Sequence, residues 1–130
     1  MDIKRYSENS VTVYIGDEIN EDTNKKLVHL KNELEKMKIV GVSEIVISYT
    51  SLIIYFDIFK TTGRDVEDVL KKVDLVKLEK RSLKYNLVEI PVCYGGDYGP
   101  DLELFDDNGL SPKEVIELHS DTEYLVYMLG

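Results

Sequence analysis

The chain has few of the residues that mark extracellular or membrane proteins. Its 130 residues include one cysteine, Cys93, three prolines and no tryptophan. A lone cysteine excludes an internal disulfide and is consistent with a reducing compartment. No apolar run approaches the roughly twenty residues that a membrane-spanning helix needs, and the N-terminus lacks the apolar core of a signal peptide. The sequence therefore predicts a cytoplasmic protein with no membrane contact.

Positive charge is scarce after Pro91. From there on, nine acidic residues face a single base, Lys113, so this part carries −8 of the net charge of −9. Such a surface repels phosphate backbones and anionic headgroups, and we expect neither nucleic acid nor membranes as partners. Two interpretations of the acidic surface stay open. It is either a solvated face or a surface complementary to a basic partner subunit.

Apolar periodicity before Pro91 predicts strands and helices in alternation. They are a strand at 11–15, a helix at 20–38, an antiparallel hairpin of strands at 44–48 and 52–57, a helix opening at 61–65, and a strand at 87–90. The order β-α-β-β-α-β is that of a ferredoxin-like α+β sandwich, in which two helices cover one face of a four-stranded sheet. Pro91 has no amide hydrogen for a ladder, and we place the end of this domain there.

A short loop after the proline gathers glycine, tyrosine and carboxylate. Its members are Tyr94, Gly95, Gly96, Asp97, Tyr98, Gly99 and Asp101. Glycine permits positive φ or a close backbone approach, and Pro100 stiffens the exit. The loop is either a tight solvated connector or a contact surface for a ligand or partner, with the tyrosine pair as its apolar part. We expect Asp101 to cap the next helix, whereas Asp97 is left open between cation binding and acid–base chemistry.

A second pattern predicts a helix with a well-defined start. Ser111 is placed as the N-cap, Pro112 at the first helical position and Glu114 as the second half of a capping box. The helix ends at His119 and Ser120, and the composition of the apolar run Tyr124–Leu129 then predicts a strand. That strand has no partner in the sequence pattern, so we expect a homodimer or strand addition through it.

The candidate chemistry is limited. No Gly-x-Ser-x-Gly elbow supports a Ser-His-Asp triad, so His119 is interpreted as a structural or subunit-contact residue, including contact with the helix C-terminus. His29 is expected to be half-buried, and Cys93 to be packed and inert in a strand. No Cys-x-x-Cys pair or histidine cluster indicates a metal, and no P-loop indicates ATP bound by this chain.

The ordered motifs support a resemblance that covers about forty residues. They are Ile90-Pro91-Val92-Cys93-Tyr94-Gly95-Gly96-Asp97-Tyr98-Gly99-Pro100-Asp101-Leu102, then Gly109-Leu110-Ser111-Pro112-x-Glu114-Val115-Ile116, His119-Ser120 and Tyr124-x-Val126-Tyr127-Met128-x-Gly130. This pattern resembles the family that contains the B subunit of 5-oxoprolinase, allophanate hydrolase subunit 1 and the Kip inhibitor of the sporulation histidine kinase. The resemblance implies a ferredoxin-like N-terminal domain at 1–90. It implies that 91–130 is the incomplete beginning of a cyclophilin-like β domain, most of which is missing.

The resemblance implies the B subunit of an ATP-dependent 5-oxoprolinase, which opens the lactam of 5-oxo-proline to glutamate together with the A and C subunits. ATP would then be used by the assembled complex, and we expect this chain alone to be inactive. A non-catalytic inhibitor that docks on a histidine kinase, and an allophanate hydrolase subunit 1, stay open as alternatives. No catalytic role is assigned to any residue. The candidate substrate- or partner-binding residues are Tyr94, Gly95, Gly96, Asp97, Tyr98, Gly99, Asp101, His119 and Ser120.

Overall fold

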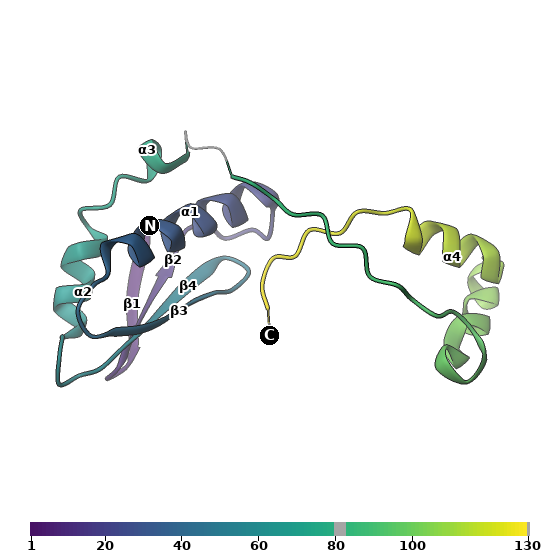
Figure 1. Cartoon of the computed structure of the whole chain (residues 1–130), viewed down its shortest axis with the longest axis horizontal. Coiled ribbons are helices and arrows are strands. Elements are labelled where there is room, and N and C mark those ends of the chain that lie inside the picture. The colour runs from purple at the N-terminus through teal and green to yellow at the C-terminus, as the bar shows by residue number, and fades with distance from the viewer. Residues whose placement is uncertain (80–82, 130) are drawn as a thin grey trace. The chain divides into compact units, whose positions relative to one another are not determined.

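The chain forms two compact units. The computed structural model describes residues 1–79 and 83–129, with the backbone alone at 78, 79, 103 and 106–108. Unit 1 comprises Met1–Lys84 together with Val126–Gly130, and unit 2 comprises Tyr85–Leu125 (Figure 1). Unit 2 is therefore inserted in the sequence between the main part of unit 1 and its last residues. In the described part of the chain, no helix is long and apolar enough to cross a bilayer.

Unit 1 is built on a four-stranded antiparallel sheet. Its strands are β1 (Asp2–Ser7), β2 (Ser10–Tyr14), β3 (Val42–Ile47) and β4 (Ser51–Phe56), in the order β1-β2-β4-β3. β2 and β4 are central and pair with Val13 opposite Leu52. Their β-branched and large apolar residues suit a pleated, half-buried surface. The hairpin of β3 and β4 and its antiparallel pairing confirm the sequence prediction.

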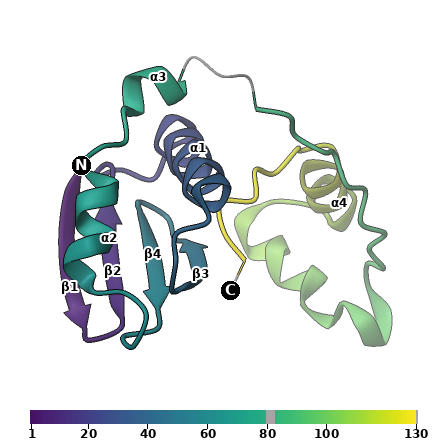
Figure 2. The ribbon, with the colours of Figure 1, turned by 60° about the vertical axis from the view of Figure 1, so that its left-hand side comes forward.

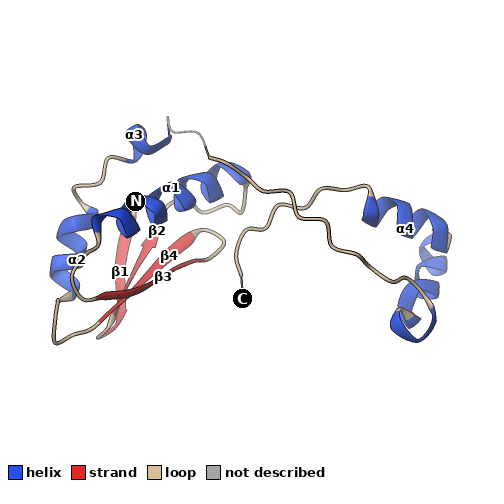
Figure 3. Cartoon of the chain, viewed as in Figure 1, coloured by secondary structure: helices blue, strands red, loops and turns tan. Residues whose placement is uncertain are grey.

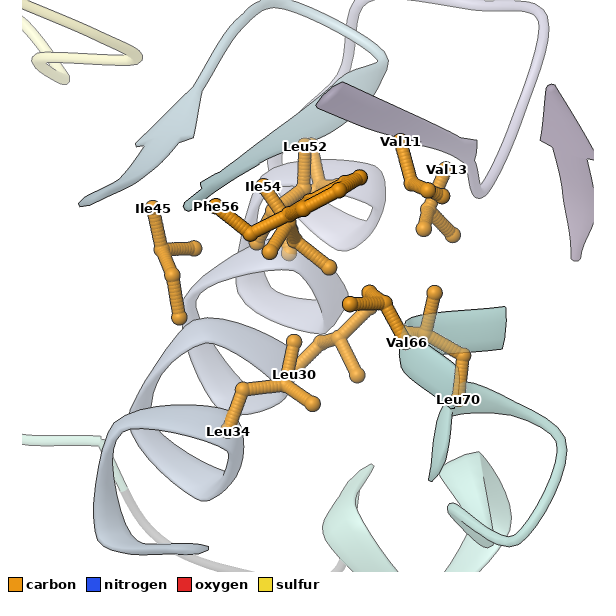
Figure 4. Packing of buried hydrophobic residues seen from close by; sticks show 11 residues of the cluster. Val11, Val13, Leu30, Leu34, Ile45, Leu52, Ile54, Phe56, Val66 and Leu70 are labelled. Carbon is orange, nitrogen blue, oxygen red and sulfur yellow. The ribbon is translucent and has the colours of Figure 1, made fainter. Parts of the chain in front are cut away.

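Two helices, α1 (Glu21–Met37) and α2 (Gly63–Leu70), cover one face of this sheet (Figure 2). Leu27, Leu30 and Leu34 recur at helical spacing on α1, and all three are buried. They meet apolar side chains of the sheet and of α2 to form one core (Figure 4). The core comprises Val11, Val13, Leu27, Leu30, Leu34, Ile45, Leu52, Ile54, Phe56, Val66 and Leu70. The α+β layering predicted from the sequence is present.

The element order departs from the prediction at one edge of the sheet. Residues 87–90 belong to no strand, so the strand predicted there is wrong. β1 instead fills the edge beside β2, and the sequence analysis missed it. Its residues are mostly polar, and only Ile3 packs against the core, so the alternation that identifies a strand is weak. An ion pair between Arg5 Nε and Glu67 Oε1, 2.8 Å long, links β1 to α2.

The helix ends of unit 1 follow simple capping rules. The Asn20 side chain accepts a hydrogen bond from the Thr23 amide at 2.8 Å, and α1 ends at Lys38 in the left-handed region. At α2, Thr62 and Asp65 form a reciprocal capping box. α3 (Leu75–Glu79) follows as a short helix that the sequence analysis did not identify.

Replacing the N-cap of α1 should destabilise unit 1 modestly. We expect Asn20→Ala to lower the free energy of unfolding by about 1 kcal/mol, because the Thr23 amide loses its acceptor. Urea unfolding followed by far-UV circular dichroism measures this change. Asn20→Ser is the matched control, since serine is an equally good cap and should retain most of the stability. Equal losses in both variants would contradict the capping role.

Unit 2 is made of short helical elements between extended segments (Figure 3). It contains the 3-10 turns η1 (Gly96–Tyr98) and η2 (Pro100–Asn108) and the helix α4 (Pro112–Ser120). Among its described side chains, none is buried. The run Tyr124–Leu129, which was predicted to be a strand, is extended but pairs with no strand in the described structure, so that prediction is wrong. The predicted homodimer through this segment stays a prediction.

Two further residues differ from expectation. Cys93 is exposed in an extended segment rather than packed in a strand, because no sheet forms around it in the described part of unit 2. His29 is only 7% exposed and is therefore buried on α1, not half-buried. Its position between Leu27 and Leu30 places it at the margin of the apolar face.

Candidate functional site

The glycines of the loop after Tyr94 take conformations that other residues avoid. Gly95 has φ +78° and ψ −178°, a region that essentially only glycine occupies, and Gly96 has φ +59°. These two residues turn the extended chain into η1. The sequence predicted this permissive role for the loop glycines.

Gly99 is needed for the close approach of two backbone segments, not for an unusual backbone conformation. Its φ is −146°, which any residue adopts, but a Cβ at this position would lie 2.6 Å from the backbone nitrogen of Gly95. The Gly99 amide also donates to the Gly96 carbonyl at 3.3 Å. The two ends of the loop therefore touch, and only a residue without a side chain fits. The closed loop holds Asp97 and Tyr98 at the surface, with Tyr98 85% exposed.

α4 begins as the sequence predicted. The Ser111 hydroxyl lies 3.4 Å from the Glu114 amide, and the Glu114 carboxylate accepts from the Ser111 amide at 2.8 Å. Gly109 precedes the cap with φ +74°. Hydrogen bonds from the Ser111 hydroxyl and then from its amide hold the pKa of Glu114 below its ordinary value.

This lowered pKa predicts acid sensitivity of the α4 start. A group whose folded pKa is depressed stabilises the fold above its ordinary pKa, and that contribution is lost as pH falls through the folded value. We therefore expect the first turn of α4 to fray on acidification below the normal range of a glutamate, as seen in the Glu114 amide signal by NMR. In Ser111→Ala the Glu114 pKa should rise toward its ordinary value, because the hydroxyl donor is lost while the amide of residue 111 still donates. An unchanged Glu114 pKa in that variant would contradict the capping box.

The far end of α4 forms a small aromatic cluster, Tyr94–His119–Tyr124. The Tyr94 hydroxyl and His119 Nδ1 are hydrogen-bonded at 2.5 Å, and their rings meet edge-on with centroids 5.7 Å apart. The Tyr124 ring lies 5.7 Å from the imidazole at a tilt of 42°. All three residues belong to unit 2. Two segments 25 residues apart, the loop and the end of α4, are thereby joined at one histidine.

The hydrogen bond between the phenol and the imidazole can run in either direction. When His119 is neutral with its proton on Nε2, Nδ1 accepts from the Tyr94 O–H, whereas an Nδ1–H group donates to the phenol oxygen. His119 lies in the last turn of α4. The exposed imidazole and the hydroxyl bonded to it suit a contact site at the surface.

Ser120, Asp101 and Asp97 take no part in the Tyr94–His119 hydrogen bond. Ser120 Oγ lies 3.5 Å from Asp121 Oδ1, and no Ser-His-Asp triad forms among the described residues. Asp101 is the second residue of η2, so it does not precede that helix and the predicted cap is wrong. Asp97 is exposed on η1. No group of three metal-ligating side chains occurs in the described part of the chain.

Sequence reasoning did not place Tyr124 in the site. It assigned Tyr124 to a strand, and no local sequence pattern indicates its contact with His119. A separate depression of about 530 Å³ lies in unit 1, lined by Glu8, Asn9, Phe56, Asp57, Ile58 and Phe59. None of the predicted site residues lines it.

The sequence is similar to several proteins of known name. It is 35% identical over 98% of its length to the B subunit of 5-oxoprolinase from Bacillus subtilis (strain 168) and covers 58% of that protein. It is 57% identical over 33% of its length to the B subunit of 5-oxoprolinase from Escherichia coli O157:H7, covering 20% of it. The chain thus spans about three fifths of the length of the Bacillus relative and less of the other.

Two solved structures have similar folds. The conserved uncharacterized protein PH0987 from Pyrococcus horikoshii is 38% identical, with a TM-score of 0.53 over 99% of this chain and 59% of that one. TTHA0988 is 27% identical, with a TM-score of 0.76 over 95% of this chain and 24% of that one. A family described as "Carboxyltransferase domain, subdomain C and D" matches residues 1–130. The chain therefore belongs to this family, and its resemblance to the B subunit of 5-oxoprolinase is confirmed.

Proposed function

We propose that the chain acts as part of the B subunit of a 5-oxoprolinase, in a complex that opens the lactam of 5-oxo-proline to glutamate with the use of ATP. The observation that carries this proposal is the 35% identity to the Bacillus subtilis protein over nearly the whole chain. In this proposal the A and C subunits supply the rest of the catalytic machinery. The chain itself binds no ATP, and its contribution is a surface that the other subunits meet.

Unit 2 supplies that surface in this proposal. Its residues Tyr85–Leu125 include ten acidic side chains and one base, Lys113. Apolar side chains lie among them, and Leu87, Val88 and Ile90 are each more than 70% exposed. Acidic and exposed apolar groups together favour a partner with a basic rim and an apolar centre. In this proposal the protein is cytoplasmic.

The proposal also assigns each unit to a domain type of the family. Unit 1 is a variant of the ferredoxin-like plan, in which β1 replaces the last strand at the sheet edge beside β2. In this proposal unit 2 corresponds to the beginning of a cyclophilin-like β domain.

The Tyr94–His119 pair is the proposed contact point for the substrate or for a partner group at a cleft between subunits. The test is lactam turnover, measured as glutamate formed after the purified A and C subunits are added to the chain. We expect Tyr94→Phe and His119→Ala to lower turnover by about tenfold or more, the effect of losing one good hydrogen bond in the transition state. Tyr85→Phe is the control, because Tyr85 is an exposed tyrosine of the same unit outside the cluster.

Turnover that is unchanged in both cluster variants would contradict a role for the pair. A pull-down against the A and C subunits and against a histidine kinase, at low and moderate salt, tests the partner itself. We expect capture of the oxoprolinase subunits that weakens with salt, because the acidic surface of unit 2 is screened. Capture of the kinase alone would overturn the enzyme proposal in favour of an inhibitor, and capture of an allophanate hydrolase partner would reassign the substrate.

A further inference from the structure

A buried amide on α1 binds main chain from the last residues of unit 1. Asn24 is 2% exposed, and its Nδ2 donates to the main-chain carbonyl of Tyr127 at 3.0 Å. Both residues belong to unit 1, although 103 positions separate them in the sequence. A polar side chain this deeply buried costs free energy unless it is hydrogen-bonded. The segment around Tyr127 therefore supplies the acceptor for a buried donor.

A weaker contact holds the next residue of the same segment. The hydroxyl of Ser48, which directly follows β3, donates to Met128 Sδ at 3.9 Å. A thioether sulfur is a weak acceptor, so this contact ranks below the first. Tyr127 and Met128 are half-buried, whereas Val126 and Leu129 on either side are 67% and 85% exposed. Unit 1 therefore holds the segment at two successive residues.

The two contacts recognise different features of the segment. Asn24 binds a main-chain carbonyl, a group that every residue type offers. Ser48 meets a side chain, and the unbranched Met128 can adapt its shape to the surface there. The first contact is therefore independent of the side chain at its position, and the second is not.

The place where the segment lies also suits extended polypeptide. β3 is an edge strand of the sheet, with β4 on one side and no strand on the other among the described residues. Native proteins often cover such an edge with another part of the chain. The segment contacts unit 1 where α1 passes the end of this strand, at Asn24 and Ser48.

We propose that α1 and the end of β3 form a binding site for an extended polypeptide segment, and that Val126–Leu129 of the same chain is its occupant. The buried amide of Asn24 carries the recognition, because it binds one main-chain carbonyl. Ser48 adds a preference for a long, flexible side chain at the following position. All of these groups lie in unit 1, so the site does not depend on the enzymatic role proposed above.

Backbone order parameters from NMR relaxation of the full chain test this site. In the unchanged protein we expect values of about 0.85 at Tyr127 and Met128. In Asn24→Leu, which fills the space but cannot donate, they should fall below about 0.6, while the amides of β2 and β4 keep their values. Asn24→Ala gives a second variant in case Asn24→Leu does not fold. Met128→Ala removes only the weaker contact and should leave Tyr127 ordered.

Two controls make the result specific. Leu34→Val weakens the packing of the same helix further along its length, and Tyr127→Phe retains the main-chain acceptor. Both should keep an ordered segment. A mobile Tyr127 in the unchanged protein, or an ordered one in the folded Asn24 variants, would overturn the site. Equal loosening in Leu34→Val would overturn it as well, and equal loosening in Met128→Ala would overturn the leading role of the carbonyl.

Discussion

Gly99→Ala is expected to open the loop that begins at Tyr94. The added Cβ would lie 2.6 Å from the Gly95 nitrogen, and backbone atoms cannot yield as a flexible side chain does. The loop must move, so we expect the Tyr94–His119 hydrogen bond to break and lactam turnover by the reconstituted complex to fall by at least about tenfold. Loss of the Tyr94–His119 ring contact in NMR spectra reports the change directly.

Gly96→Ala is the matched control for this loop. Gly96 has φ +59°, so alanine costs about 1–2 kcal/mol of local strain there, but its Cβ meets no atom within 4 Å. The loop should keep its shape, and the cluster should persist. If Gly99→Ala retains the ring contact and full turnover, the close approach of the two glycines has no functional effect. Unit 1 should unfold at the same urea concentration in both variants.

Leu30→Ala should have the largest effect on stability. Leu30 is fully buried where α1 meets the sheet, and truncation leaves a cavity between the two layers (Figure 4). We expect a loss of about 2–5 kcal/mol in the free energy of unfolding. This is a large share of the roughly 5–15 kcal/mol that a domain of ordinary size has. Urea unfolding followed by far-UV circular dichroism gives the value.

Met37→Ala provides the comparison on the same helix. Met37 follows Leu30 by seven residues, a helical spacing, but its side chain is 43% exposed at the end of α1. We expect a change within about 0.5 kcal/mol. Similar losses from Leu30→Ala and Met37→Ala would contradict the assignment of Leu30 to the core and of Met37 to the surface.

Much of unit 1 could be predicted because its elements carry their own signals. The leucine spacing of α1, the caps at Asn20 and Thr62 and the apolar strands of the β3–β4 hairpin each determine local structure. β1 could not be predicted in this way. Its residues are polar, and its place is set by pairing with β2, a contact between segments that no local pattern records. The strand expected at 87–90 had the right composition, but β1 occupies the sheet edge beside β2 that it was expected to join.

The site was predictable in its parts but not in its connections. The glycines of the loop and the Ser111–Glu114 cap were identified from sequence, since each reflects a local backbone requirement. The pairing of Tyr94 with His119 depends on how the loop and α4 meet, and the role of Tyr124 depends on the path of the chain after α4. Spacing alone predicts neither contact.

Co-elution with the purified A and C subunits tests most directly whether the chain belongs to a 5-oxoprolinase complex. The chain is mixed with the two subunits and passed over a size-exclusion column at low and at moderate salt. We predict a joint peak at low salt that weakens at moderate salt, because unit 2 presents ten acidic residues and one base to its partner. Separate elution of the chain at both salt concentrations would contradict the account.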